Sequence, residues 1–88
     1  MKIKYLRSFS KDLRKIKNKK VKTALKSCIQ ELKQAENLEQ IGQLKKLKGH
    51  PFAYRIRLGS YRLGFFYKDD ILTLARFVKR EDIYKLFP

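Results

Sequence analysis

A short segment of the chain places three arginines where they could act together on one ligand. Residues 54–63 read YRIRLGSYRL, in which apolar and other positions alternate on both sides of Gly59. This alternation is typical of strands with one buried face, and a two-residue loop that begins with glycine suits a type II′ hairpin turn. The spacing therefore predicts a β-hairpin that carries Arg55, Arg57 and Arg62 on one face.

The two-residue turn also fixes which residues of the hairpin lie opposite one another. Arg57 is expected opposite Arg62, and Arg55 opposite Gly64. Like charges that face each other destabilise a strand pair, and such conflicts are expected at functional sites. Guanidinium groups match the oxygens of a phosphate, and the missing side chain of Gly64 is expected to open a groove for a ligand backbone. The alternative is a solvated sheet face whose arginines point into water.

The net charge extends this signal to the whole chain. The 88 residues include 23 Lys and Arg against 8 Asp and Glu, a formal charge of +15. A charge of this size attracts phosphate backbones and opposes compaction. We therefore expect a polyanionic partner, RNA in particular, and we expect Phe66 on the arginine-bearing face to stack a base. The alternative is a charged surface that serves only solubility.

The remaining residues must build the scaffold that positions the hairpin. Apolar residues recur at helical spacing in the first half of the chain and alternate in the last third. In chain order we expect a strand over 2–6, a helix from about Lys11 capped by Ser8 or Ser10, a second helix over 21–35 with a core-facing apolar stripe, an irregular loop over 37–51, strands over 52–58, 61–68 and 71–78, and a short helix or tail over 80–86. The predicted fold class is α+β in the order β-α-α-β-β-β, with an antiparallel sheet packed by a helical hairpin.

The last predicted strand does not alternate cleanly. Leu72 and Leu74 are expected to face the core, and strict alternation would place Arg76 there as well. Either the strand bulges or Arg76 lies at the rim of the sheet. Phe77 and Lys79 are then expected to lie on the basic face.

Composition excludes several classes of protein. A chain of this length has room for one core, so residues 1–88 are expected to form a single domain. Cys28 is the only cysteine, which excludes an internal disulfide and fits a buried apolar position. His50 is the only histidine and is expected in a loop, and we expect no metal and no cofactor. Without a signal peptide or a membrane-length apolar run, a cytoplasmic location is expected.

Four segments together resemble a known family. They read FSKDLRKI at 9–16, LKKLKG at 44–49, the arginine hairpin at 54–63, and FVKREDIY at 77–84. In this combination the chain resembles the RelE/ParE superfamily of bacterial toxins from type II toxin–antitoxin systems, over nearly its whole length. The resemblance implies the same order of elements. Its RelE-like branch is an mRNA interferase, an endoribonuclease that cleaves mRNA in the ribosomal A site and leaves a 2′,3′-cyclic phosphate and a 5′-hydroxyl.

The resemblance also implies catalytic roles for five side chains. Arg55 and Arg57 hold the scissile phosphate and favour the 2′-oxyanion, and Arg62 stabilises charge on the pentacoordinate transition state. Arg80 protonates or neutralises the leaving 5′-oxygen, and Tyr84 stacks on or orients a base. The RelE-like pattern often has lysines where Arg55 and Arg57 stand. Because arginine barely deprotonates, catalysis here is expected to rest on electrostatics.

Further RNA contacts are expected from basic and aromatic residues around these five. They are Lys45, Lys46, Lys48, Phe66, Phe77 and Lys79. The partners that the resemblance implies are mRNA on the ribosome and an acidic antitoxin protein that covers or displaces part of the basic face. Two alternatives stay open: a ParE-like inhibitor of DNA gyrase without nuclease activity, and a non-catalytic basic RNA-binding module.

Overall fold

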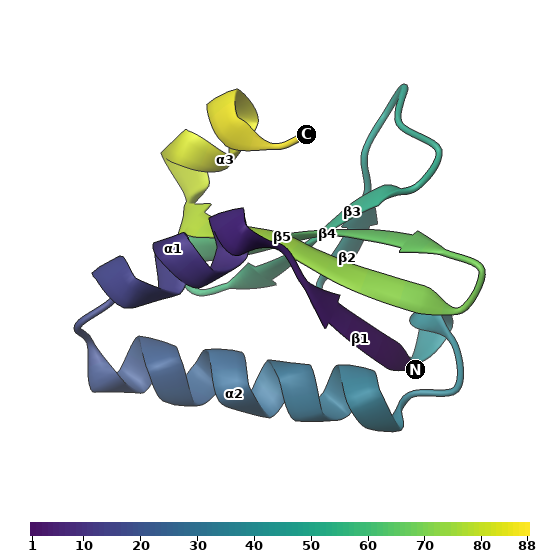
Figure 1. The fold of residues 1–88 in the computed structure, drawn as a ribbon, viewed down its shortest axis with the longest axis horizontal. Helices are drawn as coiled ribbons and strands as arrows, with labels where there is room; N and C mark the ends of the chain where they lie inside the picture. Colours follow the sequence, from purple (N-terminus) through teal and green to yellow (C-terminus); the bar gives the residue numbers. More distant parts are fainter.

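The computed structural model describes residues 1–88, which form one five-stranded sheet and three α-helices (Figure 1). In chain order the elements are β1 (Lys2–Tyr5), α1 (Arg7–Lys15), α2 (Lys19–Gln34), the 3-10 helix η1 (Leu38–Gln40), β2 (Leu44–Lys46), β3 (Ala53–Leu58), β4 (Tyr61–Lys68), β5 (Ile71–Lys79) and α3 (Arg80–Leu86). None of the helices is both long and apolar enough to cross a membrane. The predicted α+β class and the order of its elements are confirmed, with β2 as an additional strand.

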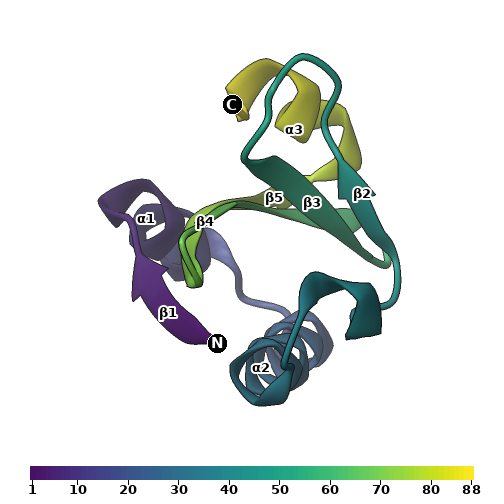
Figure 2. The same ribbon diagram turned by 90° about the vertical axis from the view of Figure 1, so that its right-hand side faces the viewer.

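The strands lie in the order β1-β5-β4-β3-β2. β1 runs parallel to β5, and every other neighbouring pair is antiparallel. The sheet is therefore mixed and not purely antiparallel as predicted. Between β1 and its parallel neighbour β5, the chain passes through α1, α2 and the other three strands. The helices α2 and α3 lie on opposite sides of the sheet (Figures 1 and 2).

The register of the arginine hairpin is confirmed. Arg57 lies opposite Arg62 and Arg55 lies opposite Gly64. Gly59 has a positive φ of 60°, while Ser60 does not, which is the pattern that a type II′ turn requires.

The segment over 37–51 contains a strand where an irregular loop was expected. β2 pairs antiparallel with β3 and places Lys45 opposite Arg55. A strand of three residues is too short to show a period of its own, and its backbone groups are satisfied by β3 rather than by a local turn. The strand matters for function because it forms one edge of the arginine-bearing face.

The first helix begins at Arg7 rather than near Lys11, and no serine side chain caps it. The hydroxyl of Ser8 instead donates to the carbonyl of Ala75 at 2.6 Å, so it is used in a contact with β5. The second helix begins after Asn18, whose side chain accepts from the backbone N–H groups of the first turn. This is ordinary N-capping.

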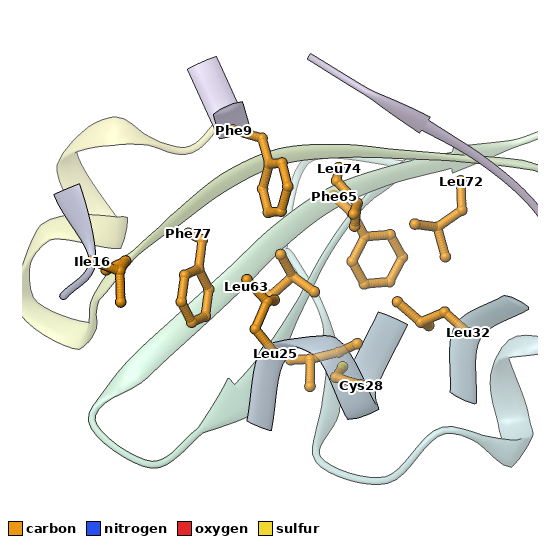
Figure 3. Packing of buried hydrophobic residues seen from close by; sticks show 11 residues of the cluster. Phe9, Ile16, Leu25, Cys28, Leu32, Leu63, Phe65, Leu72, Leu74 and Phe77 are labelled. Carbon is orange, nitrogen blue, oxygen red and sulfur yellow. The ribbon is translucent and has the colours of Figure 1, made fainter. Parts of the chain in front are cut away.

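The main core lies between the sheet and the pair α1 and α2, as predicted (Figure 3). Its eleven buried residues are Phe9, Ile16, Leu25, Cys28, Leu32, Ile56, Leu63, Phe65, Leu72, Leu74 and Phe77. Leu25, Cys28 and Leu32 confirm that the apolar stripe of α2 faces the core, although Ala24 in the same stripe is exposed.

A bulge in β5 places Phe77 in this core, so its predicted position on the basic face is wrong. Gly64 pairs with Arg76 while Phe65 pairs with Leu74, which leaves Ala75 as the extra residue. The extra residue restores the apolar alternation, and the Phe77 side chain lies 1% exposed against Leu63 and its neighbours. Of the two outcomes that the sequence left open at Arg76, the structure has the bulge.

Arg76 and the edge of β5 are held by a buried carboxylate of α1. Asp12, 4% exposed, accepts from Arg76 Nε at 2.8 Å and from its Nη2 at 3.0 Å. It also accepts from the backbone N–H of Phe77 at 2.9 Å. Because β1 ends beside Leu74, Asp12 satisfies a β5 group that has no strand partner, and α1 is fixed at this point of the sheet.

Candidate functional site: a basic cavity

The five side chains that were predicted to do chemistry line one cavity of about 430 Å³. We call it the basic cavity, and its lining residues are Gln43, Leu44, Lys45, Arg55, Arg57, Arg62, Arg80 and Tyr84. They come from the segment 43–45, from β3 and β4, and from α3. No carboxylate is among them, so the cavity presents a concentrated positive charge that only an external anion can neutralise.

Arg62 is the most firmly held guanidinium of the basic cavity. Its Nη1 donates to the carbonyl oxygens of Gly59 and Tyr61, each at 2.9 Å. Burial, followed by the positive charges of Arg57 and Arg80, lowers the pKa of Arg62. The turn carbonyls thus fix a cation in a place where its neighbours repel it, which leaves its remaining donors available for an anion.

Tyr84 closes the other side of the basic cavity. Its side chain is 62% exposed, and the Arg55 guanidinium carbon lies 4.8 Å from the centre of its ring. Hydrogen bonding from Arg80, followed by the positive charge of Arg55, lowers the pKa of the Tyr84 hydroxyl. An exposed ring beside two guanidinium groups offers both a stacking surface and a polar edge.

The helix α3 is anchored on the sheet face opposite the main core. Ile83 and Phe87 are buried there in a second cluster with Ala53 and Ala75. The backbone N–H of Arg80 donates to the carbonyl of Ser60 at 2.9 Å, which ties the start of α3 to the hairpin turn. Because Arg80 and Tyr84 are four residues apart on a helix, they share the face that looks toward the basic cavity.

Gly64 makes room for Phe87, which helps to anchor α3 on the sheet. The prediction that Gly64 opens a groove for a ligand backbone is therefore wrong. A Cβ atom built on Gly64 would lie 2.7 Å from Cδ2 of Phe87 and 2.8 Å from its Cγ. The ring of Phe87 occupies the space that the missing side chain leaves. The contact joins Gly64 and Phe87, which are far apart in the sequence, so no local sequence pattern predicts it.

The six additional RNA-contact residues are distributed differently from the prediction. Lys45 lines the basic cavity, whereas Lys46 pairs with Tyr54 and Lys48 lies exposed in the loop beyond β2. Phe66 packs against Phe87 with ring centres 5.0 Å apart and does not line the basic cavity.

Phe77 and Lys79 also lie away from the basic cavity. Phe77 is in the main core, and Lys79 lines a separate cavity between α1, β5 and α3 together with Asp12 and Asp82. Both displacements follow from the bulge in β5, because it shifts the faces of every residue after Ala75.

Two lining residues were missed by the sequence analysis. Leu44 and Gln43 enter the site because β2 pairs with β3. Gln43 has a left-handed backbone with a φ of 59°, and its carbonyl accepts from the N–H of Arg57 at 3.1 Å. The only nearby signal is Gly42, which marks a break in the helical spacing but not the strand that follows.

Other groups with possible chemistry lie outside the basic cavity. Cys28 is buried in the main core, and burial followed by the charge of Glu31 raises its pKa to about 11, which is the opposite of an activated thiolate. His50 is exposed in the loop between β2 and β3, as predicted. No group of three or more His, Cys, Asp or Glu side chains is placed to hold a metal ion.

Comparison with known proteins decides the family. The profile of the family described as the ParE toxin of type II toxin–antitoxin systems matches residues 3–84. Toxin RelE3 of Methanocaldococcus jannaschii is 33% identical over 89 residues, which cover all of both chains. This chain belongs to the RelE/ParE toxin family of type II toxin–antitoxin systems.

Solved structures agree with this assignment. The RelB–RelE antitoxin–toxin complex of Methanococcus jannaschii contains a chain that superposes with a TM-score of 0.82 at 30% identity, over 97% of this chain and 99% of that one. The intact RelBE toxin–antitoxin complex of E. coli contains a chain with a TM-score of 0.65 at 23% identity, over 89% and 94% of the two chains, and it shares the fold. Within the family this toxin is RelE-like, because the relative that matches it over full length carries that name.

Proposed function

We propose that this RelE/ParE-family toxin is a ribosome-dependent mRNA endonuclease that inhibits translation in the cytoplasm. The observation that carries the proposal is the convergence of Arg55, Arg57, Arg62, Arg80 and Tyr84 on one cavity without a carboxylate. Such a cavity suits a reaction in which negative charge develops on phosphate oxygens. A plain RNA-binding surface has no need of a helix that is anchored to bring two residues to the same place.

The proposed reaction is an internal transfer at the scissile phosphate. The 2′-oxygen of the upstream nucleotide attacks phosphorus, the bond to the 5′-oxygen of the next nucleotide breaks, and a 2′,3′-cyclic phosphate and a 5′-hydroxyl are formed. Arg55 and Arg57 hold the phosphate, and Arg62 stabilises charge on the pentacoordinate transition state. Arg80 neutralises the leaving 5′-oxygen, which takes a proton from water to become the 5′-hydroxyl, and Tyr84 stacks on a base.

The 2′-proton needs an acceptor that the arginines cannot supply, because guanidinium groups stay protonated. No histidine or carboxylate lines the basic cavity. In our proposal a group of the ribosome or of the ribosome-bound RNA takes this proton, so cleavage is expected to depend on the ribosome. The protein contributes position and electrostatic stabilisation.

The proposed protein partner is an acidic antitoxin. The charge of +15 favours an acidic chain, and the relatives from Methanococcus jannaschii and E. coli are toxins in complex with their antitoxins. Neutralisation follows if this partner covers the basic cavity or displaces α3. The second candidate function is inhibition of DNA gyrase, which the match to the ParE family profile keeps open.

Inducible expression followed by primer extension on a reporter mRNA tests the proposal. We expect cuts in phase with codons, and we expect Arg62→Ala to abolish both the cuts and the growth arrest. Arg14→Ala removes the same charge from an exposed position of α1 and is the matched control. Intact mRNA together with gyrase-linked DNA breaks would replace the nuclease by the second candidate, and a fully toxic Arg62→Ala variant would contradict the site.

A further inference from the structure

A second cavity adjoins the basic cavity and shares Gln43 and Arg57 with it. Its volume is about 360 Å³, and it lies between α2, the segment before β2, and β3. We call it the apolar cavity after the apolar half of its ten lining residues: Ala24, Cys28, Ile41, Ile56 and Leu58. Ser27 and the carboxylate of Glu31 line it as well. The two cavities therefore meet at one amide side chain and one guanidinium.

Gln43 stands at this junction in an unfavourable backbone conformation. Its φ of 59° lies in the left-handed region, where residues with a Cβ are disfavoured and glycine is preferred. Gly42 stands immediately before it and has no positive φ. The chain thus carries glycine at the position that does not need it and a glutamine at the position that does. Strained backbone of this kind clusters at functional sites, which makes the Gln43 side chain a candidate for a functional role.

The backbone around Gln43 is fixed on both sides. Its carbonyl accepts from the N–H of Arg57 at 3.1 Å, and the ladder between β2 and β3 begins at the next residue, with Leu44 opposite Ile56. The backbone of Gln43 is therefore held in place, and its exposed side chain extends from a fixed point of the chain. An apolar cavity with a polar side chain at its rim is the arrangement that orients a small flat ligand.

We propose that the apolar cavity receives one base of the RNA strand and that Gln43 reads the edge of that base. The inference rests on the proposed nuclease function. Sequence-specific binding of single-stranded RNA places unstacked bases against apolar or guanidinium surfaces and bonds their edges to polar side chains. Arg57 offers the guanidinium surface, the partly exposed Ile41 and Leu58 offer the apolar one, and the Gln43 amide offers a donor and an acceptor. With the phosphate in the basic cavity, Gln43 sets which base is preferred beside the cut.

The test measures cleavage of ribosome-bound mRNAs that differ by one base at each position of the A-site codon. We expect wild-type protein to prefer one base at one position, and we expect Gln43→Gly to lower that preference about tenfold, as for the loss of one base-edge contact. Because glycine relieves the left-handed strain, the same variant is expected to unfold at a higher urea concentration. A purely structural role predicts the gain in stability without the loss of preference.

Two further variants make the result specific. Asp69→Gly relieves a left-handed φ of 52° at the β4–β5 turn and is the matched control, expected to keep the base preference. Ala24→Leu fills the apolar cavity from an exposed position of α2, and it is expected to raise the KM for preferred codons.

The outcomes separate this inference from the proposed function. If wild-type protein cuts no ribosome-bound mRNA, the nuclease proposal fails. If wild-type protein cuts and Gln43→Gly keeps its base preference within twofold, only the base-reading role fails. Loss of antitoxin binding in Gln43→Gly and Ala24→Leu with unchanged base preference would also overturn it, because the apolar cavity would then serve the protein partner.

Discussion

Tyr84 is an exposed aromatic side chain beside four arginines, and its neighbours give it two separable properties. Its ring lies 4.8 Å from the guanidinium carbon of Arg55, so Arg55 can stack on one face while a base stacks on the other. Its hydroxyl receives hydrogen bonding from Arg80, which lowers its pKa. Ring and hydroxyl can therefore be tested independently.

The ring is tested by comparing Tyr84→Phe with Tyr84→Ala. We expect Tyr84→Phe to keep most of the affinity for single-stranded RNA, and Tyr84→Ala to lose about tenfold, because one base–aromatic stacking contact is removed. Fluorescence anisotropy with a short labelled RNA measures both. Equal affinities for the two variants would show that the ring does not stack on the RNA.

The hydroxyl is tested by pH. A lowered pKa means that the charged phenolate is favoured, so Tyr84 loses its proton at a lower pH than an ordinary tyrosine does. As pH rises through that pKa, a negative charge appears inside the basic cavity and opposes phosphate binding. We expect RNA affinity to fall on the alkaline side in wild-type protein and to stay flatter in Tyr84→Phe. The same fall in both proteins would assign it to other groups.

At the scale of elements, α3 is held by its buried cluster and by the bond from Arg80 N–H to Ser60, and the tightest contact of this anchor is at Gly64. The ring of Phe87 fits against the backbone of Gly64, where a Cβ would lie 2.7 Å away. Arg80 and Tyr84 depend on this contact, since they are carried on the helix that it anchors.

Gly64→Ala tests the anchor. We expect it to destabilise the protein by about 2 kcal/mol through overpacking, and to reduce cleavage further by displacing Arg80 and Tyr84. Urea unfolding and primer extension give the two readouts. Gly42→Ala is the matched control, because nothing lies within 4 Å of a Cβ at that position and its φ is not positive. Full activity of Gly64→Ala would show that the position of α3 does not depend on the contact between Gly64 and Phe87.

The contact between α1 and β5 rests on Asp12. Asp12→Asn keeps the shape of the side chain but removes the charge that faces Arg76 and turns one acceptor into a donor. We expect a loss of about 3 kcal/mol in the free energy of unfolding, because the half-buried Arg76 loses its charged partner and the buried hydrogen bonds at Asp12 are disrupted. Glu39→Gln, at an exposed acid of η1, is expected to have little effect. A loss for Asp12→Asn as small as that of Glu39→Gln would contradict the role.

The elements also show what the sequence could predict. The hairpin register followed from one two-residue turn, and with it the positions of Arg55, Arg57 and Arg62. The β5 bulge was visible only as a conflict at Arg76, since the group that resolves the conflict, Asp12, lies 64 residues away. Non-local partners of this kind leave no periodic trace in the chain.

The same reason explains the errors around the site. β2 is too short to show alternation, so Gln43 and Leu44 were missed although Lys45 was included. Gly64 accommodates the ring of Phe87 and does not open the groove that was expected. Local chemistry was therefore predictable, whereas the completion of the basic cavity by β2 and α3 was not.

At the scale of the whole molecule, the net charge attracts RNA from a distance, whereas the side chains of the basic cavity contact its phosphates directly. The dependence of RNA affinity on salt distinguishes the two contributions. The lysines of α2 and the five cationic side chains of the basic cavity contribute to one net charge of +15. Counterion release makes the affinity for single-stranded RNA fall with salt by roughly 0.7 logarithmic units per contacted phosphate and per decade of salt.

This separation predicts different salt slopes for two variants. Arg62→Ala removes a phosphate contact in our proposal, so the slope for a short RNA is expected to fall by roughly 0.7. Lys22→Ala removes the same charge from an exposed position of α2 and is expected to leave the slope unchanged. Titrations of RNA at several KCl concentrations measure both slopes. Equal changes in the two variants would place the RNA over the helices as well.

The parallel pairing of β1 with β5 has a consequence for the order of events during synthesis. Residues 2–5 can pair only after their partners, residues 71–74, have been synthesised. In the same way, the arginines of β3 and β4 form the complete basic cavity only after α3 and Phe87 have been synthesised. Since a nascent chain emerges from its first residue onward, a ribosome making this toxin carries an unfinished site until residue 87 is free. Nascent chains that have not yet released the segment around Phe87 are therefore expected to lack RNase activity.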